Sequence, residues 1–350
     1  MNADKLSRNL KTRFESGRYE GDWGATGMFE AKSLSRIICK VVVAAGISVA
    51  MAPAFGAAVQ IDDPAMLRDL HVPTYVWQQE GDSKPQAIVV GFHGGCLHGK
   101  SFDTLGRKLA DRDVMFVSLD MRGYGKWYYK NYGTEDDKTF NYTRTIEDIR
   151  GVLTALHKQY PGTPVYCIGE SLGANMAMVI GHKMPELTNG VVLVSPVYGP
   201  RIWLSPRFLA NGAHVALHPR KGMLDMSPYL KTRLSPNPEL SLQQIEDPLS
   251  RDKQTAKELG QSMALNFSGK KQSRMINAPT AVLIMHGKED RLCNPRVTAR
   301  EFEKIPTSNK QLALLDGVGH LAVETSEIDP KVFSTLTTWI DAQGKAIATR

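Results

Sequence analysis

The stretch Pro164-Val165-Tyr166-Cys167-Ile168-Gly169-Glu170-Ser171-Leu172-Gly173 decides the fold of this chain. Its apolar first half predicts a buried strand, and the residues that follow Ser171 continue as an apolar helix. A tight turn from strand to helix tolerates only small neighbours, which explains the glycines at 169 and 173. Such a turn lifts the serine hydroxyl above the edge of the sheet, beside unpaired N–H groups of the helix. The motif alone is a weak signal, and the strand and helix around it give it weight.

Strand-like and helix-like segments alternate on both sides of this motif. Strands are expected at 72–79, 86–92, 114–119, 165–168, 191–194, 281–286 and 311–315. Helices are expected at 101–112, 143–160, 172–183, 296–304 and 331–348. Alternation of this kind predicts an α/β fold with a mostly parallel sheet and helices on both faces.

The alternation lapses between residues 201 and 278, where prolines and short helix-like pieces replace it. An insertion after about the sixth strand is typical of a lid over the end of the sheet. We therefore expect an α/β core formed by residues 59–200 and 279–350, with residues 201–278 as the lid.

Two further segments supply partners for Ser171. In this architecture the chain order is nucleophile, acid, histidine. Of nine histidines, only His320 follows the strand 281–286 and its loop, and it lies in a glycine-rich loop after the strand 311–315. The loop after 281–286 offers two carboxylates, Glu289 and Asp290, either of which could orient an imidazole. Asp316 shares the loop of His320, so we expect it to brace that loop.

The loop after the strand 86–92 completes the expected site. Its sequence His93-Gly94-Gly95 allows a backbone N–H to face a developing oxyanion, and we expect Gly95 to donate it together with the N–H of Leu172. We expect His93 to hold this loop by side-chain hydrogen bonds. The sequence shows neither a convincing metal-ligand cluster nor a phosphate-binding loop, so no metal and no cofactor are expected.

Over residues 72–345 the chain resembles α/β-hydrolases of the monoglyceride lipase and lysophospholipase type. The motifs that carry the resemblance are His93-Gly94 with His98, Asp120-Met121-Arg122-Gly123-Tyr124-Gly125, Gly169–Gly173, Ser195-Pro196, Asp247-Pro248-Leu249 and Gly287-Lys288-Glu289-Asp290-Arg291-Leu292-Cys293. The resemblance implies a lid between the sixth and seventh conserved strands that shapes an apolar acyl tunnel. The chain departs from the family pattern at Tyr124, where a histidine is usual, and at Trp127.

The same resemblance assigns the roles of individual residues. It implies a catalytic triad of Ser171, Asp290 and His320, with Gly95 and Leu172 as oxyanion donors. It also implies that Cys293 lies near the site. Glu289 is the alternative to Asp290 that the resemblance disfavours.

Three functions are compatible with these residues. The first is hydrolysis of hydrophobic acyl esters, such as monoacylglycerol or lysophospholipid, with lid residues that include Trp203 and Phe208 lining an acyl pocket. The second is aminopeptidase-like amide hydrolysis, which requires lid carboxylates to hold a substrate ammonium. The third is a non-catalytic binding protein, which typically lacks a member of the triad.

The net charge of +7 is mild for 350 residues and forms no long basic run outside the N-terminus. Nucleic acid is therefore not an expected partner. Residues 201–235 carry six Lys or Arg against one acidic residue. This local excess favours an anionic headgroup or peripheral contact with membrane lipid.

Residues 1–58 have the layout of a secretory signal peptide. Basic residues precede the apolar run 41–52, and small residues follow it. We expect export to the periplasm or medium, with cleavage near Phe55 or Val59; the alternative is a membrane anchor formed by residues 37–58. Loss of Cys39 with the leader would leave Cys96, Cys167 and Cys293, an odd number that implies at least one free thiol.

Overall fold

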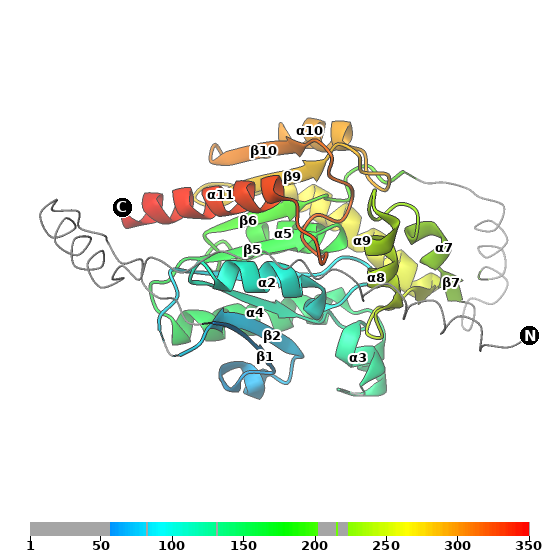
Figure 1. Cartoon of the computed structure of the whole chain (residues 1–350), viewed down its shortest axis with the longest axis horizontal. Coiled ribbons are helices and arrows are strands. Elements are labelled where there is room, and N and C mark those ends of the chain that lie inside the picture. The colour runs from blue at the N-terminus through cyan, green and yellow to red at the C-terminus, as the bar shows by residue number, and fades with distance from the viewer. Residues whose placement is uncertain (1–56, 82, 131, 202–214, 216–222, 350) are drawn as a thin grey trace, which may run out of the picture. The chain divides into compact units, whose positions relative to one another are not determined.

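Figure 1 shows the computed structural model of the chain, which describes residues 57–81, 83–130, 132–201, 215 and 223–349. The expected leader therefore lies almost wholly outside the described residues. Among the described residues, no helix is long and apolar enough to cross a membrane.

The core is an eight-stranded sheet with the strand order β1-β2-β4-β3-β5-β6-β9-β10. The strands are β1 (Ala58–Asp62), β2 (Thr74–Gln79), β3 (Ala87–Phe92), β4 (Val114–Leu119), β5 (Val165–Glu170), β6 (Gly190–Val194), β9 (Ala281–Gly287) and β10 (Lys310–Leu315). From β4 to β10 the neighbours pair in parallel, whereas β1–β2 and β2–β4 are antiparallel. The predicted α/β architecture is confirmed, and β1 is a strand that the sequence did not predict.

Helices cover both faces of the sheet (Figure 1). The main core helices are α2 (Asp103–Ala110), α4 (Tyr142–Gln159), α5 (Leu172–Lys183), α10 (Pro295–Phe302) and α11 (Pro330–Ala348). Successive side chains of β3 enter opposite cores: Ile88 and Val90 join the apolar cluster of α4 and α5, and Val89 joins that of α2 and α11. Burial on both faces explains why these strands are continuous apolar runs rather than alternating ones.

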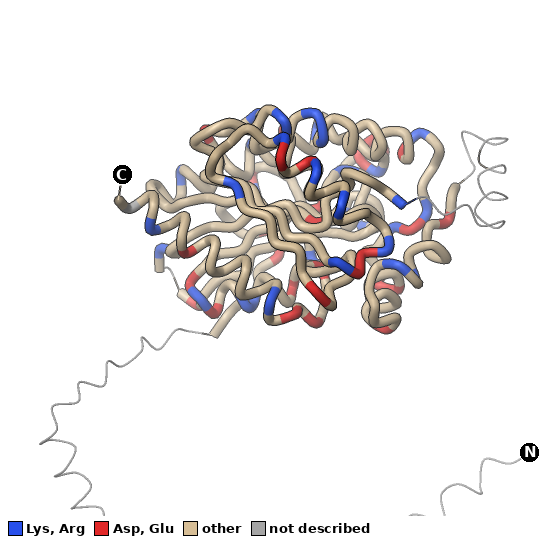
Figure 2. The backbone as a smooth tube through the Cα atoms, turned by 90° about the horizontal axis from the view of Figure 1, so that it is seen from above, with Lys and Arg blue, Asp and Glu red and all other residues tan. Residues whose placement is uncertain are grey.

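Several short elements connect the strands. They are η1 (Ala65–Leu70), η2 (Gly99–Phe102), α3 (Gly125–Tyr129) and η3 (Glu135–Lys138). Figure 2 shows the charges of both signs interspersed along the helices and loops.

The described part of the segment 201–278 stands apart from the large sheet. It contains β7 (Met223–Asp225), α7 (Ser227–Leu230), α8 (Pro238–Glu246), β8 (Lys253–Thr255) and α9 (Ala256–Ser273), and β7 pairs with β8. Helix α9 packs against α5 so closely that a Cβ on Gly269 would lie 2.6 Å from the backbone oxygen of Asn175. The span expected for the lid thus includes a helix that lies on the core.

Candidate active site

Ser171 occupies a strained turn between β5 and α5. Its φ of 54° and ψ of −115° lie where a residue with a side chain is seldom found. A Cβ on Gly169 would collide with the backbone of Gly173, and one on Gly173 with the backbone oxygen of Phe92. The backbone N–H of Ser171 donates to the oxygen of Val194 at 2.9 Å, which holds the strained residue in place. The spacing of the two glycines is therefore a steric requirement of this turn.

Asp290 joins two histidines deep in the protein. Its Oδ2 accepts hydrogen bonds from Nδ1 of His320 at 2.8 Å and from Nε2 of His286 at 2.9 Å. Its Oδ1 accepts from the backbone N–H groups of Leu292 at 2.7 Å and Cys293 at 2.8 Å. With the proton of His320 on Nδ1, its Nε2 is left as the basic nitrogen.

The charges of this cluster shift its pKa values in opposite directions. Burial would raise the pKa of Asp290, but the two histidines outweigh burial and hold that pKa well below its usual range. Burial would lower the pKa of His320, but Asp290 and then Glu170 outweigh it, so the net pKa is raised. An imidazole stabilised in its protonated form is what a general base needs during proton transfer.

The two carboxylates left open by the sequence have different surroundings. Glu289 is exposed and accepts the backbone N–H of Gly317 at 2.8 Å. Asp316 pairs with Lys288 at 2.8 Å, as expected for a residue that braces its loop. Only Asp290 of these three acids contacts His320.

A cavity of about 250 Å³ contains both Ser171 and His320. Gly95, Leu172 and Cys293 also line it, together with a largely apolar set from the segment after 222: Met226, Tyr229, Leu230, Leu234, Leu259 and Met263. Trp203 and Phe208, expected from the sequence in the acyl pocket, lie outside the described residues. The structure thus brings the predicted nucleophile, base and oxyanion donors to one apolar cavity.

The loop of Gly94 and Gly95, in which we expect an oxyanion donor, is fixed by hydrogen bonds of His93. His93 accepts the backbone N–H of Met121 on Nε2 at 3.0 Å, and its Nδ1 lies 2.8 Å from the oxygen of Gly94. Burial lowers the pKa of His93 to about 3, so it is neutral and structural, as expected. The N–H groups of Gly95 and Leu172 donate no hydrogen bond to any described residue, which leaves them available to a ligand.

Asp290, Cys293 and His320 each place one potential metal-ligand atom within 4.8 Å of the others. The set suits a metal poorly, because both oxygens of Asp290 already accept two hydrogen bonds each. Burial and the nearby Asp290 also raise the pKa of the Cys293 thiol well above its usual range. Cys96, Cys167 and Cys293 are all buried, unpaired thiols.

The segment 247–258 is bound to the core by buried polar contacts. Asp247 pairs with the buried His98 at 3.0 Å, which joins two residues of the family motifs. Buried Arg251 pairs with Glu258 at 2.8 Å and donates to the backbone oxygen of Gly123 at 2.9 Å, and its own N–H donates to the oxygen of Cys96 at 2.7 Å. These contacts place one wall of the cavity, which includes Gln254, against the loop of Gly95 and Cys96.

Sequence reasoning missed three buried residues of this region. His286 ends the predicted strand 281–286, and its spacing of four from Asp290 was the available signal. Glu170 stands inside the serine motif itself, and Glu324 follows His320 by four residues. An ionisable residue in an otherwise apolar or glycine-rich segment is the signal that could have found the two glutamates.

The parallel sheet, the serine turn and the acid and histidine that follow it along the chain define an α/β-hydrolase. A family model described as serine aminopeptidase, S33, matches residues 83–326, more than half of the chain. The protein belongs to this family of α/β-hydrolases.

Known relatives agree with this assignment. Monoglyceride lipase of Rattus norvegicus is 24% identical over 280 residues, which cover 75% of this chain and 84% of the relative. Monoacylglycerol lipase of Mycolicibacterium smegmatis is 22% identical over 272 residues, covering 76% and 91%. The crystal structure of Paleococcus ferrophilus monoacylglycerol lipase matches the fold with a TM-score of 0.59 at 19% identity, covering 82% of this chain and 99% of that one. The resemblance to the monoglyceride lipase group is confirmed.

Proposed function

We propose that this protein is a serine esterase that cleaves hydrophobic carboxylic esters through an acyl-enzyme on Ser171. The observation that carries the proposal is the cavity in which Ser171 and His320 meet, with Nδ1 of His320 tied to Asp290 at 2.8 Å. The relatives named as monoglyceride lipases support the same substrate class.

The proposed reaction has two halves. In the first, Oγ of Ser171 attacks the ester carbonyl carbon while Nε2 of His320 takes the hydroxyl proton, and the N–H groups of Gly95 and Leu172 stabilise the oxyanion. The tetrahedral intermediate collapses, and His320 gives the proton to the departing alcohol. In the second half, a water loses a proton to His320 and attacks the acyl-enzyme, which releases the acid and returns the proton to Ser171.

Ester substrates fit the cavity better than aminopeptidase substrates. An aminopeptidase needs a carboxylate to hold the substrate ammonium, but the described residues that line the cavity include no Asp or Glu. Residues 202–222, which the structure leaves largely undescribed, contain no acidic residue in their sequence either. We therefore favour a neutral monoacylglycerol-like ester over an amide with a free amine.

The rate for esters of increasing acyl length tests the substrate class. Each methylene buried in the cavity should contribute about 0.8 kcal/mol, nearly fourfold in kcat/KM, until the cavity is full. Leu230→Ala and Leu234→Ala should flatten this dependence for nitrophenyl esters of two to twelve carbons, with acetyl ester hydrolysis nearly unchanged. Leu314→Ala, at an exposed leucine of β10 outside the cavity, is the matched control. A preference for acetyl esters, or faster cleavage of aminoacyl anilides than of esters, would contradict the proposal.

An anionic lysophospholipid is a second candidate, favoured by a basic hollow beside the cavity. Arg201, Arg233 and Arg291 line this hollow of about 320 Å³ together with Thr232. The hollow adjoins the cavity through Leu292, which lines the cavity and whose backbone oxygen accepts the N–H of Arg201 at 2.7 Å. Guanidinium groups suit phosphate oxygens well, so an anionic headgroup fits this hollow.

A charge-removal pair distinguishes the two substrates. Arg201→Gln/Arg291→Gln should raise KM for an anionic lysophospholipid about tenfold and leave that for monoacylglycerol within about twofold. Arg112→Gln, an exposed arginine at the far end of the sheet, serves as control. An equal rise in KM for both substrates would show that the arginines do not recognise an anionic headgroup.

Contact with lipid surfaces is a further part of the proposal. Met263 and Phe267 lie one turn apart on α9 and are 57% and 69% exposed, and Met263 also lines the cavity. Lys270 and Lys271 follow on the same helix. Phe267→Ser should weaken cosedimentation with anionic vesicles, whereas Leu314→Ser should not; equal binding by both variants would count against this surface.

We also propose that residues 1–58 direct export. Mass spectrometry of the exported fraction should find an N-terminus near Phe55 or Val59. An intact Met1 or Met28 in that fraction would rule out cleavage and favour the anchor at residues 37–58.

A further inference from the structure

Two carboxyl groups that the proposed reaction does not use are buried directly behind the site. Glu170 ends β5, immediately before Ser171, and Glu324 lies in the loop that begins at His320. Both side chains are 0% exposed. Acidic side chains are almost never fully buried without charged partners, so the arrangement calls for a physical reason.

Glu170 holds the backbone of the histidine loop. Its Oε1 accepts the N–H of Ala322 at 2.6 Å, and its Oε2 accepts the N–H of Glu324 at 2.9 Å. The N–H of Val323 lies 3.3 Å from both oxygens. A carboxyl group that accepts several backbone N–H groups is stabilised in its ionised form.

Glu324 reaches in the opposite direction, to the oxyanion loop. Its Oε2 accepts the backbone N–H of Gly94 at 2.7 Å, directly before the proposed oxyanion donor Gly95. Its Oε1 is buried and has no hydrogen-bond partner among the described residues. An oxygen that accepts no hydrogen bond is the one better suited to carry a proton.

The charged and titratable groups that face the pair are few. His320 lies close enough to Glu170 for each to affect the other's pKa, and His93, which adjoins Gly94, is neutral. No Lys or Arg among the described residues forms an ion pair with either glutamate. Burial, and for Glu324 also the proximity of Glu170, raises the pKa of both carboxyl groups. Two adjacent carboxylates without a cation cannot both ionise at neutral pH.

We propose that Glu170 and Glu324 hold one proton between them at neutral pH, carried by Glu324, and that the pair positions the His320 loop against the oxyanion loop. Both are positioning residues, because they act through His320 and Gly95 rather than on the substrate. This inference rests on the proposed function of His320 as base and Gly95 as oxyanion donor. It adds that Glu170 supplies a negative charge that favours protonated His320.

The protonation state can be measured without activity. Infrared difference spectroscopy at pH 7 should detect the carbonyl stretch of a buried, protonated carboxyl in wild type. Ser171→Ala should retain this band and Glu324→Gln should lose it. Glu327→Gln, at an exposed glutamate three residues further along the same loop, should retain it. Absence of the band from wild type, or its persistence in Glu324→Gln, would overturn the shared proton.

The positioning role is tested by activity. Glu324→Gln keeps a neutral acceptor for the N–H of Gly94, whereas Glu324→Leu leaves that buried donor unpaired, so kcat/KM at pH 7 should be about tenfold or more lower for Leu than for Gln. Glu170→Gln removes the charge beside His320, which should move the acid limb of the pH profile to lower pH by on the order of 0.5 to 1 unit. Equal losses in Gln and Leu at position 324, with an unmoved acid limb in Glu170→Gln, would leave only a packing role.

Failure of the proposed function has a different signature. If Ser171→Ala keeps full esterase activity while the infrared band behaves as expected, the catalytic assignment is wrong and the buried pair stands. If Ser171→Ala is inactive and the infrared band is missing from wild type, the catalytic assignment stands and the protonated glutamate pair is wrong.

Discussion

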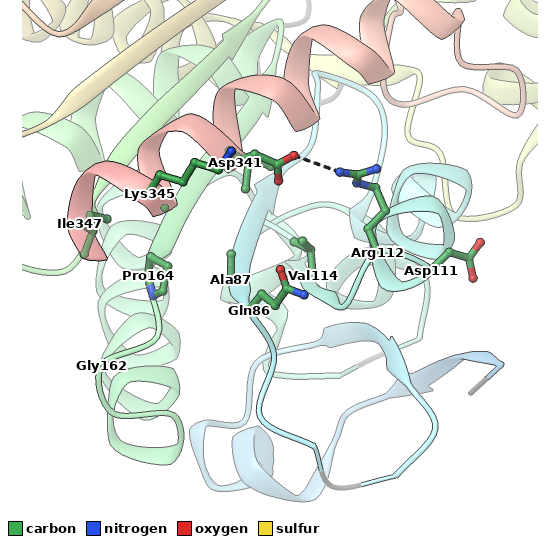
Figure 3. Close-up of a pocket in the computed structure, with 12 residues that line it drawn as sticks. Gln86, Ala87, Asp111, Arg112, Val114, Gly162, Pro164, Asp341, Lys345 and Ile347 are labelled. Carbon is green, nitrogen blue, oxygen red and sulfur yellow. Dashed lines mark hydrogen bonds and ion pairs between the residues drawn. The ribbon is translucent and has the colours of Figure 1, made fainter. Parts of the chain in front are cut away.

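The two ends of the parallel sheet each carry a hollow, and Ser171 and His320 line the one at the carboxyl ends. At the amino ends, about 770 Å³ lies between α11 and the starts of β3 and β4, lined by residues such as Gln86, Val114 and Lys345 (Figure 3). At the carboxyl ends, the cavity of Ser171 and His320 is only about 250 Å³. The residues of the candidate active site thus lie in the smaller of the two hollows.

The difference lies in how charges are held. Arg112 and Asp341 face each other across the amino-end hollow at 3.0 Å, but both side chains are about half exposed, so water screens them (Figure 3). Asp290, His320 and Glu170 are buried, where a neighbouring charge shifts a pKa strongly. Carboxyl ends of parallel strands also lead into helix N-termini, whose free N–H groups favour negative charge. The burial of charged groups, and not the volume of the hollow, therefore distinguishes the carboxyl end as the candidate site.

The sharpest way to break this comparison is to remove the nucleophile. Ser171→Ala should lower kcat by about 10⁴ or more while the protein stays folded, because it removes the hydroxyl proposed to form the acyl-enzyme. A fluorophosphonate probe should label wild type and leave the variant unlabelled. Full labelling of the variant would move the nucleophile elsewhere, and an unlabelled, inactive wild type would favour the non-catalytic binding protein.

The next largest effect is expected at the acid. Asp290→Asn should lower kcat by on the order of 10⁴, since an amide that donates to Nδ1 of His320 stabilises the wrong tautomer. Glu289→Gln, one residue away and exposed, is the matched control and should change kcat less than about threefold. The reverse ranking in steady-state kinetics would assign the role to Glu289.

The pH profile sharpens the electrostatic side of the comparison. In the proposed mechanism His320 acts as a base only when neutral, and its pKa is raised above its ordinary 6.5 by Asp290 and Glu170. kcat/KM should therefore fall as pH drops through a midpoint above 6.5, about tenfold per unit below it. A midpoint at or below 6.5 would show that burial outweighs the two carboxylates.

The smallest effect is expected at the amino end. Arg112→Ala breaks an exposed ion pair with Asp341, so it should cost at most about 1 kcal/mol in the free energy of unfolding. kcat/KM should stay within about twofold of wild type. A larger loss of activity in this variant, measured alongside urea unfolding, would mean that the amino-end hollow takes part in function.

Much of the fold followed from local patterns. The strand 114–119 and the helix 172–183 are confirmed residue for residue, because buried strands and an apolar helix after a tight turn leave continuous apolar runs. β1 escaped prediction because Ala58–Asp62 is a short, partly exposed edge strand whose pairing with β2 leaves no apolar pattern. The packing of helix α9 on α5 did not follow from the sequence, since helical periodicity does not say which neighbour a helix covers.

Some residues of the candidate site could also be predicted from the sequence, and others could not. Chain order and a glycine-rich loop were enough to single out His320, and the structure places it against Asp290. The spacing of His286 from Asp290 and the apolar neighbours of Glu324 were faint signals, but the hydrogen bonds that bring these residues to the site appear only in the folded chain. The raised pKa of the two glutamates is likewise a property of burial, which only the folded chain creates.

The contacts of Arg251 set a boundary for exchanging the expected lid, residues 201–278, between homologues. Its backbone and guanidinium bind the oxygens of Cys96 and Gly123, and it pairs with Glu258 in the first turn of helix α9. A chimera in which the exchanged segment extends past residue 251 would replace Arg251, and with it the hydrogen bonds to the loop that precedes it in the fold. An exchange of residues 201–246 keeps the native Asp247–Glu258 segment, but it replaces Leu234, whose oxygen accepts the N–H of Leu321 at 2.8 Å, next to His320. Such an exchange therefore has to supply an equivalent backbone contact for the loop of His320.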